Sequence, residues 1–270
     1  MMSTSKKITS GLLAATFVLA VSAVPSFAAD KPTADLSVDA LSKYVWRGFE
    51  LSRDSMVLQP SATVDYKGFS VNLWGNLDTD TYSGSTNNWT ETDMTLSYSR
   101  SLGMVNLTGG YIYYGLDNAN DTQEVYLSAS LNTILSPTLS VYRDYDSFPG
   151  WYITLGISHS VPIKDNITLD LGAQVSYLSA DEASSYGEVE NGVQSTTQAY
   201  NAFHDGLLTA SVTFPVNQYI SITPKLNYSF PLTDDARDLI KVTSLGYDQT
   251  THSGGHDNFL YGGINVDLSF

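Results

Sequence analysis

The last eleven residues of the chain, 260–270, alternate between apolar and polar side chains. Because successive side chains of a strand face opposite sides, this stretch is predicted to be a strand with one apolar and one polar face. The apolar set is Leu260, Gly262, Ile264, Val266, Leu268 and Phe270, and the polar set is Tyr261, Gly263, Asn265, Asp267 and Ser269. What this strand means depends on whether the rest of the chain repeats the pattern.

Alternating segments of this kind recur about every 20 residues, which predicts about twelve strands in one array. Each is close to the roughly 9–11 residues that a tilted strand needs to cross a bilayer. The predicted ranges are 33–46, 56–66, 69–78, 91–100, 104–114, 122–131, 138–145, 151–161, 167–178, 207–214, 219–230 and 258–270.

The connections between these segments alternate in length. Tight links such as 67–68, 101–103 and 162–166 alternate with longer polar links, of which 79–90, 179–206 and 231–257 are the longest. Short turns on one side and long loops on the other are expected of outer-membrane barrels. With an even number of strands, both ends of the wall fall on the short-turn side.

The alternation alone does not say which face is inside. A lipocalin-like barrel packs its apolar face inward, whereas a membrane barrel turns it outward. Aromatic residues at strand ends, small polar residues on the other face and a terminal Phe270 favour the second arrangement. The fold class is therefore predicted to be all-β: a closed antiparallel transmembrane β-barrel of about twelve strands. Phe270 is interpreted as a signal to the outer-membrane barrel assembly machinery.

The amino terminus does not belong to this pattern. Lys6 and Lys7 precede an apolar run, and small residues end it near Ala28. We interpret residues 1–28 as a secretory signal peptide that is cleaved after about Ala28, leaving residues 29–270 as a single barrel domain.

Composition excludes several functions. The chain has no cysteine, so disulfides and thiol chemistry are absent, and we predict no cofactor. The signal peptide contains two of the 13 basic residues and none of the 28 acidic ones, so the mature chain is strongly acidic. This charge argues against nucleic acid as a partner and is compatible with a surface or pore that attracts cations.

The amino-terminal third resembles the TorF-type family of outer-membrane porins. The resemblance begins at SKYVWRG, residues 42–48, and continues through Gln59, Asp65-Tyr66 and GFSVNLWGN at 68–76. Weaker similarity runs through GGYIYY at 109–114 and through residues 152–162. The resemblance implies an outer-membrane channel of undefined solute, and it implies no catalytic residues.

Charged residues on the polar faces are the candidate pore lining. They are Lys43, Arg47, Asp65, Glu91, Asp93, Glu124, Asp170, Lys225 and Asp267. Arg47 has two interpretations that the sequence does not separate. It forms a constriction with Glu91, Asp93 or Glu124 whose transverse field selects solutes, or it forms an ion pair that rigidifies the wall.

Histidines raise the questions of catalysis and metal binding. His159 lies between Ser158 and Ser160, but adjacent strand residues face opposite sides, so we interpret it as an interfacial residue. His204-Asp205 resembles a protease-like pair without a second pair of carboxylates. His252 and His256 accompany several aspartates, but the glycines between them disfavour a helix, and we predict no metal site.

The sequence thus predicts a non-enzymatic, porin-like channel in the bacterial outer membrane. It would pass small polar solutes, cationic or neutral, by passive diffusion, and it would contact lipid and lipopolysaccharide. The alternatives are a closed barrel with a structural, adhesive or receptor role, and an outer-membrane hydrolase.

Overall fold

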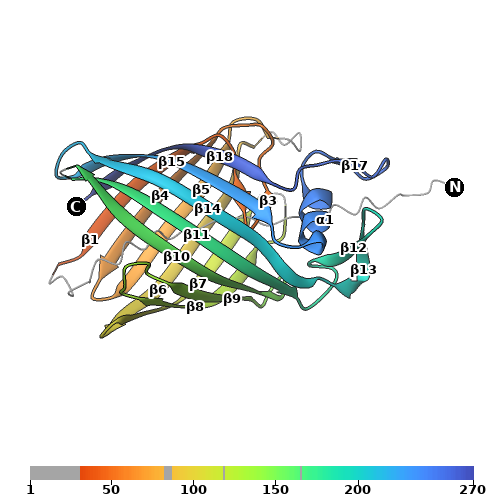
Figure 1. Cartoon of the computed structure of the whole chain (residues 1–270), viewed down its shortest axis with the longest axis horizontal. Coiled ribbons are helices and arrows are strands. Elements are labelled where there is room, and N and C mark those ends of the chain that lie inside the picture. Colours follow the sequence, from red (N-terminus) through yellow and green to blue (C-terminus); the bar gives the residue numbers. More distant parts are fainter. Residues whose placement is uncertain (1–30, 82–86, 118, 165) are drawn as a thin grey trace.

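Twelve strands close into one antiparallel barrel. The computed structural model describes residues 31–81, 87–117, 119–164 and 166–270, and in this part of the chain each wall strand pairs with two neighbours. Around the wall the order is β1, β18, β15, β14, β11, β10, β9, β8, β7, β6, β5 and β4, and β4 then pairs with β1 (Figure 1). This confirms the predicted architecture. The predicted signal peptide lies outside the described residues.

The bounds of the wall strands are β1 Thr33–Leu41, β4 Val57–Tyr66, β5 Phe69–Asp78, β6 Trp89–Leu102, β7 Val105–Leu116, β8 Thr122–Leu131, β9 Thr138–Asp144, β10 Gly150–Lys164, β11 Ile167–Ala180, β14 Asn201–Pro215, β15 Ile220–Pro231 and β18 Phe259–Ser269.

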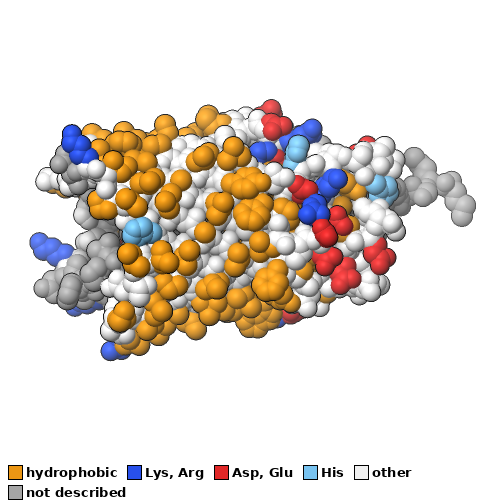
Figure 2. Space-filling view, viewed as in Figure 1, with side chains coloured by type: hydrophobic (Ala, Val, Ile, Leu, Met, Phe, Trp, Pro, Cys, Tyr) orange, Lys and Arg blue, Asp and Glu red, His pale blue; other side chains and the backbone are white. Residues whose placement is uncertain are grey.

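The apolar face of the wall is the outer one. On β18, Leu260 and Ile264 are 66% and 49% exposed, whereas Tyr261 between them is 6% exposed. Apolar side chains cover the flank of the barrel in Figure 2, and charged side chains gather towards its ends. An apolar outer face and a wall without a free edge are what hydrocarbon requires. The membrane-barrel prediction for the terminal strand is therefore confirmed.

The two ends of the barrel differ. One end carries tight connections such as Lys67-Gly68, whose φ angles of 52° and 87° suit a two-residue hairpin turn. The other end carries the additional elements: the hairpin β12–β13 (Gly187–Glu190, Val193–Ala199), helix α1 (Asp234–Thr243) and the hairpin β16–β17 (Tyr247–Asp248, Ser253–Gly254). Figure 1 shows α1 beside β12 and β13 at the end opposite the carboxy terminus. We call this the outer end.

Helix α1 is short and amphipathic. The Thr233 hydroxyl accepts a hydrogen bond from the backbone N–H of Ala236 at 3.1 Å and so caps its first turn. Ala236, Leu239 and Ile240 are completely buried against the barrel end. In the described part of the chain, no helix is long and apolar enough to cross a membrane.

The first predicted strand, 33–46, was too long. β1 ends at Leu41, and the chain then turns into the barrel, where β2 (Val45–Trp46) pairs with β3 (Phe49–Glu50). Arg47 and Gly48 form the two-residue turn of this hairpin with φ angles of 47° and 81°. Segment 42–56, which we call the inward hairpin, returns to the wall at Val57, the direct partner of Leu41.

We predict that a charge on the outer face is costly at the middle of β18. Ile264 pairs with Ala40 and Pro224 within the wall and faces outward. Ile264→Arg should lower the free energy of unfolding by about 2–4 kcal/mol, because the guanidinium would face hydrocarbon. Urea unfolding in lipid vesicles measures this. Asn265→Lys, at the adjacent inward position, is the control and should change stability by less than about 1 kcal/mol. Equal losses for both variants would contradict the assigned orientation.

Candidate functional site

The inward hairpin fills the outer half of the lumen with aromatic side chains. Trp46 and Phe49 are 2% and 1% exposed. Phe49 stacks on Tyr186 with ring centroids 5.5 Å apart, and Trp46 packs edge-on against Tyr114 at 6.4 Å. Burial raises the pKa of Tyr186, which lies in the loop after β11, so its hydroxyl stays neutral. The hairpin is thus held by large apolar contacts with β7 and with the loop after β11.

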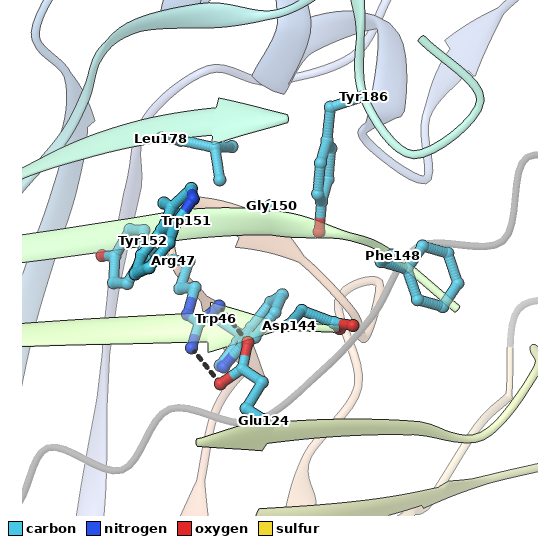
Figure 3. Close-up of a pocket in the computed structure, with 10 residues that line it drawn as sticks. All are labelled: Trp46, Arg47, Glu124, Asp144, Phe148, Gly150, Trp151, Tyr152, Leu178 and Tyr186. Atoms are coloured by element: carbon cyan, nitrogen blue, oxygen red, sulfur yellow. Dashed lines mark hydrogen bonds and ion pairs between the residues drawn. The ribbon is translucent and has the colours of Figure 1, made fainter. Parts of the chain in front are cut away.

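Arg47, at the tip of the inward hairpin, forms the central ion pair. Its two terminal nitrogens donate to the two carboxylate oxygens of Glu124 on β8 at 2.7 and 2.8 Å. The guanidinium also lies 4.3 Å from the rings of Trp46 and Tyr152. Figure 3 shows the guanidinium directed at Glu124 beside these rings. Bidentate pairing and ring contacts together fix the orientation of the side chain.

Glu124 is fully engaged in this arrangement. The Tyr114 hydroxyl donates to it at 2.9 Å, in addition to Arg47. Its side chain is 2% exposed and that of Arg47 is 11% exposed. The structure therefore brings together the predicted pair Arg47 and Glu124. A buried ion pair whose hydrogen bonds are all made both narrows the lumen and anchors the hairpin.

A β-bulge places two adjacent residues of β14 inside the barrel. The pairing of β11 with β14 shifts register between Val175 and Tyr177, and both His204 and Asp205 opposite this shift are buried. One ring nitrogen of His204 lies 3.0 Å from the carbonyl oxygen of Arg47, and the other lies 3.0 Å from the Tyr200 hydroxyl. Because a bulge breaks the alternation, sequence parity did not predict this pair, and β14 begins at Asn201 rather than at the predicted residue 207.

Asp205 accepts hydrogen bonds from the adjacent strands β10 and β11. The Tyr152 hydroxyl donates to it at 2.9 Å, and the Ser176 hydroxyl donates to it as well. Gly48 lies directly above it, because a Cβ added there would be 3.0 Å from the Asp205 Cβ and 3.0 Å from Ile240. The hairpin turn is therefore enclosed between the bulge and helix α1.

Glu50 joins the inward hairpin to the elements at the outer end, α1, β12–β13 and β16–β17, which we call the outer cap. Lys43 forms an ion pair with Glu50, whose side chain is 1% exposed. The other Glu50 oxygen accepts from the Ser244 hydroxyl at 2.9 Å, directly after helix α1. The predicted inward position of Lys43 is thus part of a contact between hairpin and cap.

Glu91 and Asp93 lie beside the inward hairpin on β6 and are 2% and 1% exposed. The Tyr44 hydroxyl donates to one Glu91 oxygen at 3.2 Å. The second Glu91 oxygen and both Asp93 oxygens have no hydrogen-bond partner in the described residues. Neither carboxylate pairs with Arg47. Of the three carboxylates that the sequence offered as its partner, the structure selects Glu124.

The other predicted lining residues lie towards the inner end. Lys225 forms an ion pair with Asp39 at 2.6 Å. Asp170 accepts from the Ser160 hydroxyl, Asp267 accepts from the Ser269 hydroxyl at 2.9 Å, and Asp65 is exposed near the tight turn after β4. These carboxylates do not join the group around Arg47. The partner of Lys225 was not predicted, although Asp39 has the inward parity that would have identified it.

The space left between the hairpin and the wall is small. The pocket lined by Arg47, Glu124, Tyr152 and Tyr186 has a cavity volume of about 10 Å³. This is roughly what one water molecule needs. The pocket beside the Arg47–Glu124 pair therefore has room for little more than one water molecule.

The remaining histidines have structural contacts. One ring nitrogen of His159 lies 2.7 Å from the Ile134 carbonyl oxygen on an exposed surface, as expected for an interfacial residue. His252 lies 3.3 Å from the Gly192 carbonyl oxygen. Within the described ranges, no group of three or more His, Cys, Asp or Glu side chains is arranged to hold a metal ion.

Comparison with known proteins identifies the fold. No family model and no curated protein matches the chain. A NanC porin structure aligns with a TM-score of 0.54 at 10% identity, covering 87% of this chain and 98% of that one. The chain has a porin fold.

Two further structures show only distant similarity at 10% identity. An anion-selective porin from Comamonas acidovorans aligns with a TM-score of 0.36 over 89% of this chain and 99% of that one. The outer membrane protease OmpT from Escherichia coli aligns with a TM-score of 0.27 over 89% and 95%. At these scores neither similarity bears on the function of this porin-fold chain.

We predict that the Arg47–Glu124 pair stabilises the inward hairpin. Arg47→Ala should lower the free energy of unfolding in lipid vesicles by about 3–5 kcal/mol, because Glu124 would remain buried without its counter-charge. Arg47→Lys should lose less, since it keeps the charge but not the bidentate geometry.

The double variant Arg47→Ala/Glu124→Gln is the control for this prediction. It should recover part of the loss, because no uncompensated carboxylate remains. If the double variant loses as much stability as Arg47→Ala and Glu124→Gln lose when their separate losses are added, the residues do not act as a pair.

Proposed function

We propose that this protein is a low-conductance channel that lets small polar solutes, cationic or neutral, diffuse passively across the membrane. Its location is the bacterial outer membrane, as the closed barrel with an apolar exterior and the porin fold show. The resemblance of residues 42–48 to the TorF-type family supports the same class. These residues form the first half of the inward hairpin, including Arg47 at its tip, so the resemblance is strongest in the segment that narrows the lumen.

The observation that carries the charge preference is the excess of carboxylates around the inward hairpin. The buried acidic side chains are Glu50, Asp78, Glu91, Asp93, Glu124, Asp144 and Asp205. Arg47 and Lys43 face them with side chains 11% and 14% exposed, and each is already paired with a glutamate. The surplus negative charge favours cations, because low-dielectric walls focus its field.

A closed barrel with a structural or receptor role is the second candidate. The cavity of about 10 Å³ beside Arg47 favours it, because no solute larger than water would pass there. The two candidates differ in whether the inward hairpin leaves a path along another part of the wall. Elements α1 and β12–β13 would then present a rigid outer surface to lipopolysaccharide or to a ligand.

An enzymatic role is not proposed. A hydrolase would need a histidine with one ring nitrogen available to a nucleophile. Both ring nitrogens of His204 contact the hairpin or its support, and His159 contacts a backbone carbonyl. Phe270, which is 63% exposed and lies 6.5 Å from the Tyr219 ring, is proposed as a contact for the assembly machinery.

We predict that removing the inward hairpin widens the channel. Leu41 and Val57 are direct cross-strand partners, so a four-residue Gly–Ser turn can replace residues 42–56 without stretching the wall. In planar bilayers the intact protein should give small, cation-preferring steps. The shortened variant should give conductance at least several-fold higher, because the aromatic filling is gone.

Shortening the β12–β13 hairpin, which lies outside the wall, is the matched control and should leave the step size nearly unchanged. Intact protein that gives no steps at all, while the shortened variant conducts, would support the closed-barrel candidate. Anion preference in the intact protein would refute the cation-leaning channel.

A further inference from the structure

The inner faces of β5 and β6 carry a run of oxygen atoms that no group in the described residues bonds. The unbonded atoms are Glu91 Oε1, both carboxylate oxygens of Asp93, Thr95 Oγ1 and Asn72 Oδ1. Glu91, Asp93 and Thr95 occupy successive inward positions of β6. Asn72 is the direct cross-strand partner of Thr95 on β5. The run therefore begins beside the inward hairpin and continues down the wall towards the inner end.

No cationic side chain in the described residues forms an ion pair with Glu91 or Asp93. Glu91 and Asp93 are almost completely buried and lie close enough to interact electrostatically. The nearest positive groups are engaged elsewhere, because Arg47 pairs with Glu124 and Lys43 pairs with Glu50. An uncompensated pair of buried carboxylates is costly, so a positive species from solution would stabilise it.

The remaining groups around the carboxylates do not supply that charge. The Tyr44 hydroxyl donates to one Glu91 oxygen, and Tyr114, the cross-strand partner of Asp93, donates to Glu124 instead. The Asn72 amide nitrogen donates to Ser61 and Thr63, which leaves its carbonyl oxygen facing the run. The hydrogen bonds of the neighbours thus orient oxygens, rather than donors, towards this part of the lumen.

The chemistry of these atoms identifies the ligand class. Oxygen atoms are the ligands of hard cations such as alkali and alkaline-earth ions. A calcium site takes about 6–8 oxygens with several carboxylates, and in the described ranges no group of three or more acidic, His or Cys side chains is suited to a metal ion. Glu91 and Asp93 fall short of the several carboxylates of a calcium site, and one monovalent ion together with a proton kept on the second carboxylate would balance their charge.

We propose that Glu91 and Asp93 bind a monovalent alkali cation, Na⁺ or K⁺, and that Thr95 and Asn72 continue the row of oxygen atoms further down the wall. The binding itself stands on the contacts above. Its role as the point where cations pass the inward hairpin rests on the proposed channel function. The Arg47–Glu124 ion pair then anchors the hairpin, and the route of the cations lies beside it along β5 and β6.

Binding is tested first, without measuring flux. Crystals of the full mature protein soaked in thallium(I), a heavy substitute for K⁺, should show an anomalous peak within ligand distance of Asp93. In detergent, the melting temperature should be about 2 °C or more higher in potassium chloride than in N-methylglucamine chloride at equal ionic strength, because a ligand that binds only the folded state stabilises it.

Variants connect this effect to the site. Asp93→Asn and Glu91→Gln should each abolish the potassium-dependent shift. Asp144→Asn is the control, since Asp144 is also buried, at 6% exposed, but accepts from the Thr122 hydroxyl at 2.9 Å, and it should keep the shift. If a variant fails to fold, the thallium experiment on the unchanged protein decides.

Two results would overturn the proposal. One is the absence of a thallium peak together with equal melting temperatures in the two salts, which would mean that a proton shared by the carboxylates replaces the cation. The other is a potassium-dependent shift that survives Asp93→Asn.

The flux experiment separates this site from the channel function. In planar bilayers, Glu91→Gln/Asp93→Asn should lower the preference for K⁺ over Cl⁻ by several-fold, and by clearly more than Asp144→Asn, which removes one carboxylate outside the site. A protein that binds thallium at Asp93 but conducts no ions would refute the proposed channel and leave the cation site standing. A protein that conducts ions but shows no thallium peak at Asp93 would refute the cation site and leave the proposed channel standing.

Discussion

Backbone hydrogen bonding between β1 and β18 is the constraint on which the rest of the structure depends. Hydrocarbon supplies no partner for an unpaired peptide group, so the sheet has to return to its first strand. After closure, side chains along each strand alternate between facing lipid and facing the lumen. It also sets the cross-section: barrels of about 8 strands are filled by their own side chains, whereas those of 16–18 leave an aqueous channel. Twelve strands leave room for the two-stranded inward hairpin.

The hairpin divides the lumen into regions with different electrostatics. At its tip, Arg47 and Glu124 neutralise each other, and the aromatic rings around them exclude water. On the neighbouring wall, Glu91 and Asp93 have the same burial but no counter-charge. Towards the inner end, acidic side chains become exposed and bond to hydroxyl groups. The polarity of the lumen therefore varies around its circumference as well as along its axis.

The strands of the barrel wall can be predicted from the sequence more fully than the segments and contacts inside the lumen. Strict alternation in segments such as β11 and β15 allowed strand number, closure and the outward face to be predicted. The same rule failed where both faces of a segment are buried: residues 44–46 were assigned to the first wall strand but lie inside the barrel. It failed again at the bulge of His204 and Asp205. The pairing of Arg47 with Glu124, 77 positions apart, depends on closure and leaves no local signal.

The position of Arg47 at the tip of the inward hairpin has a consequence for the order of assembly. Apart from the adjacent Trp46, its contacts come from β8, β9, β10 and β14, all of which follow it in the chain. The hairpin turn itself is local and forms from neighbouring residues, but it has nothing to hold it until those strands are in place. Seating of the hairpin is therefore a late event, and the nascent barrel passes through a stage in which its lumen is wider than in the finished protein.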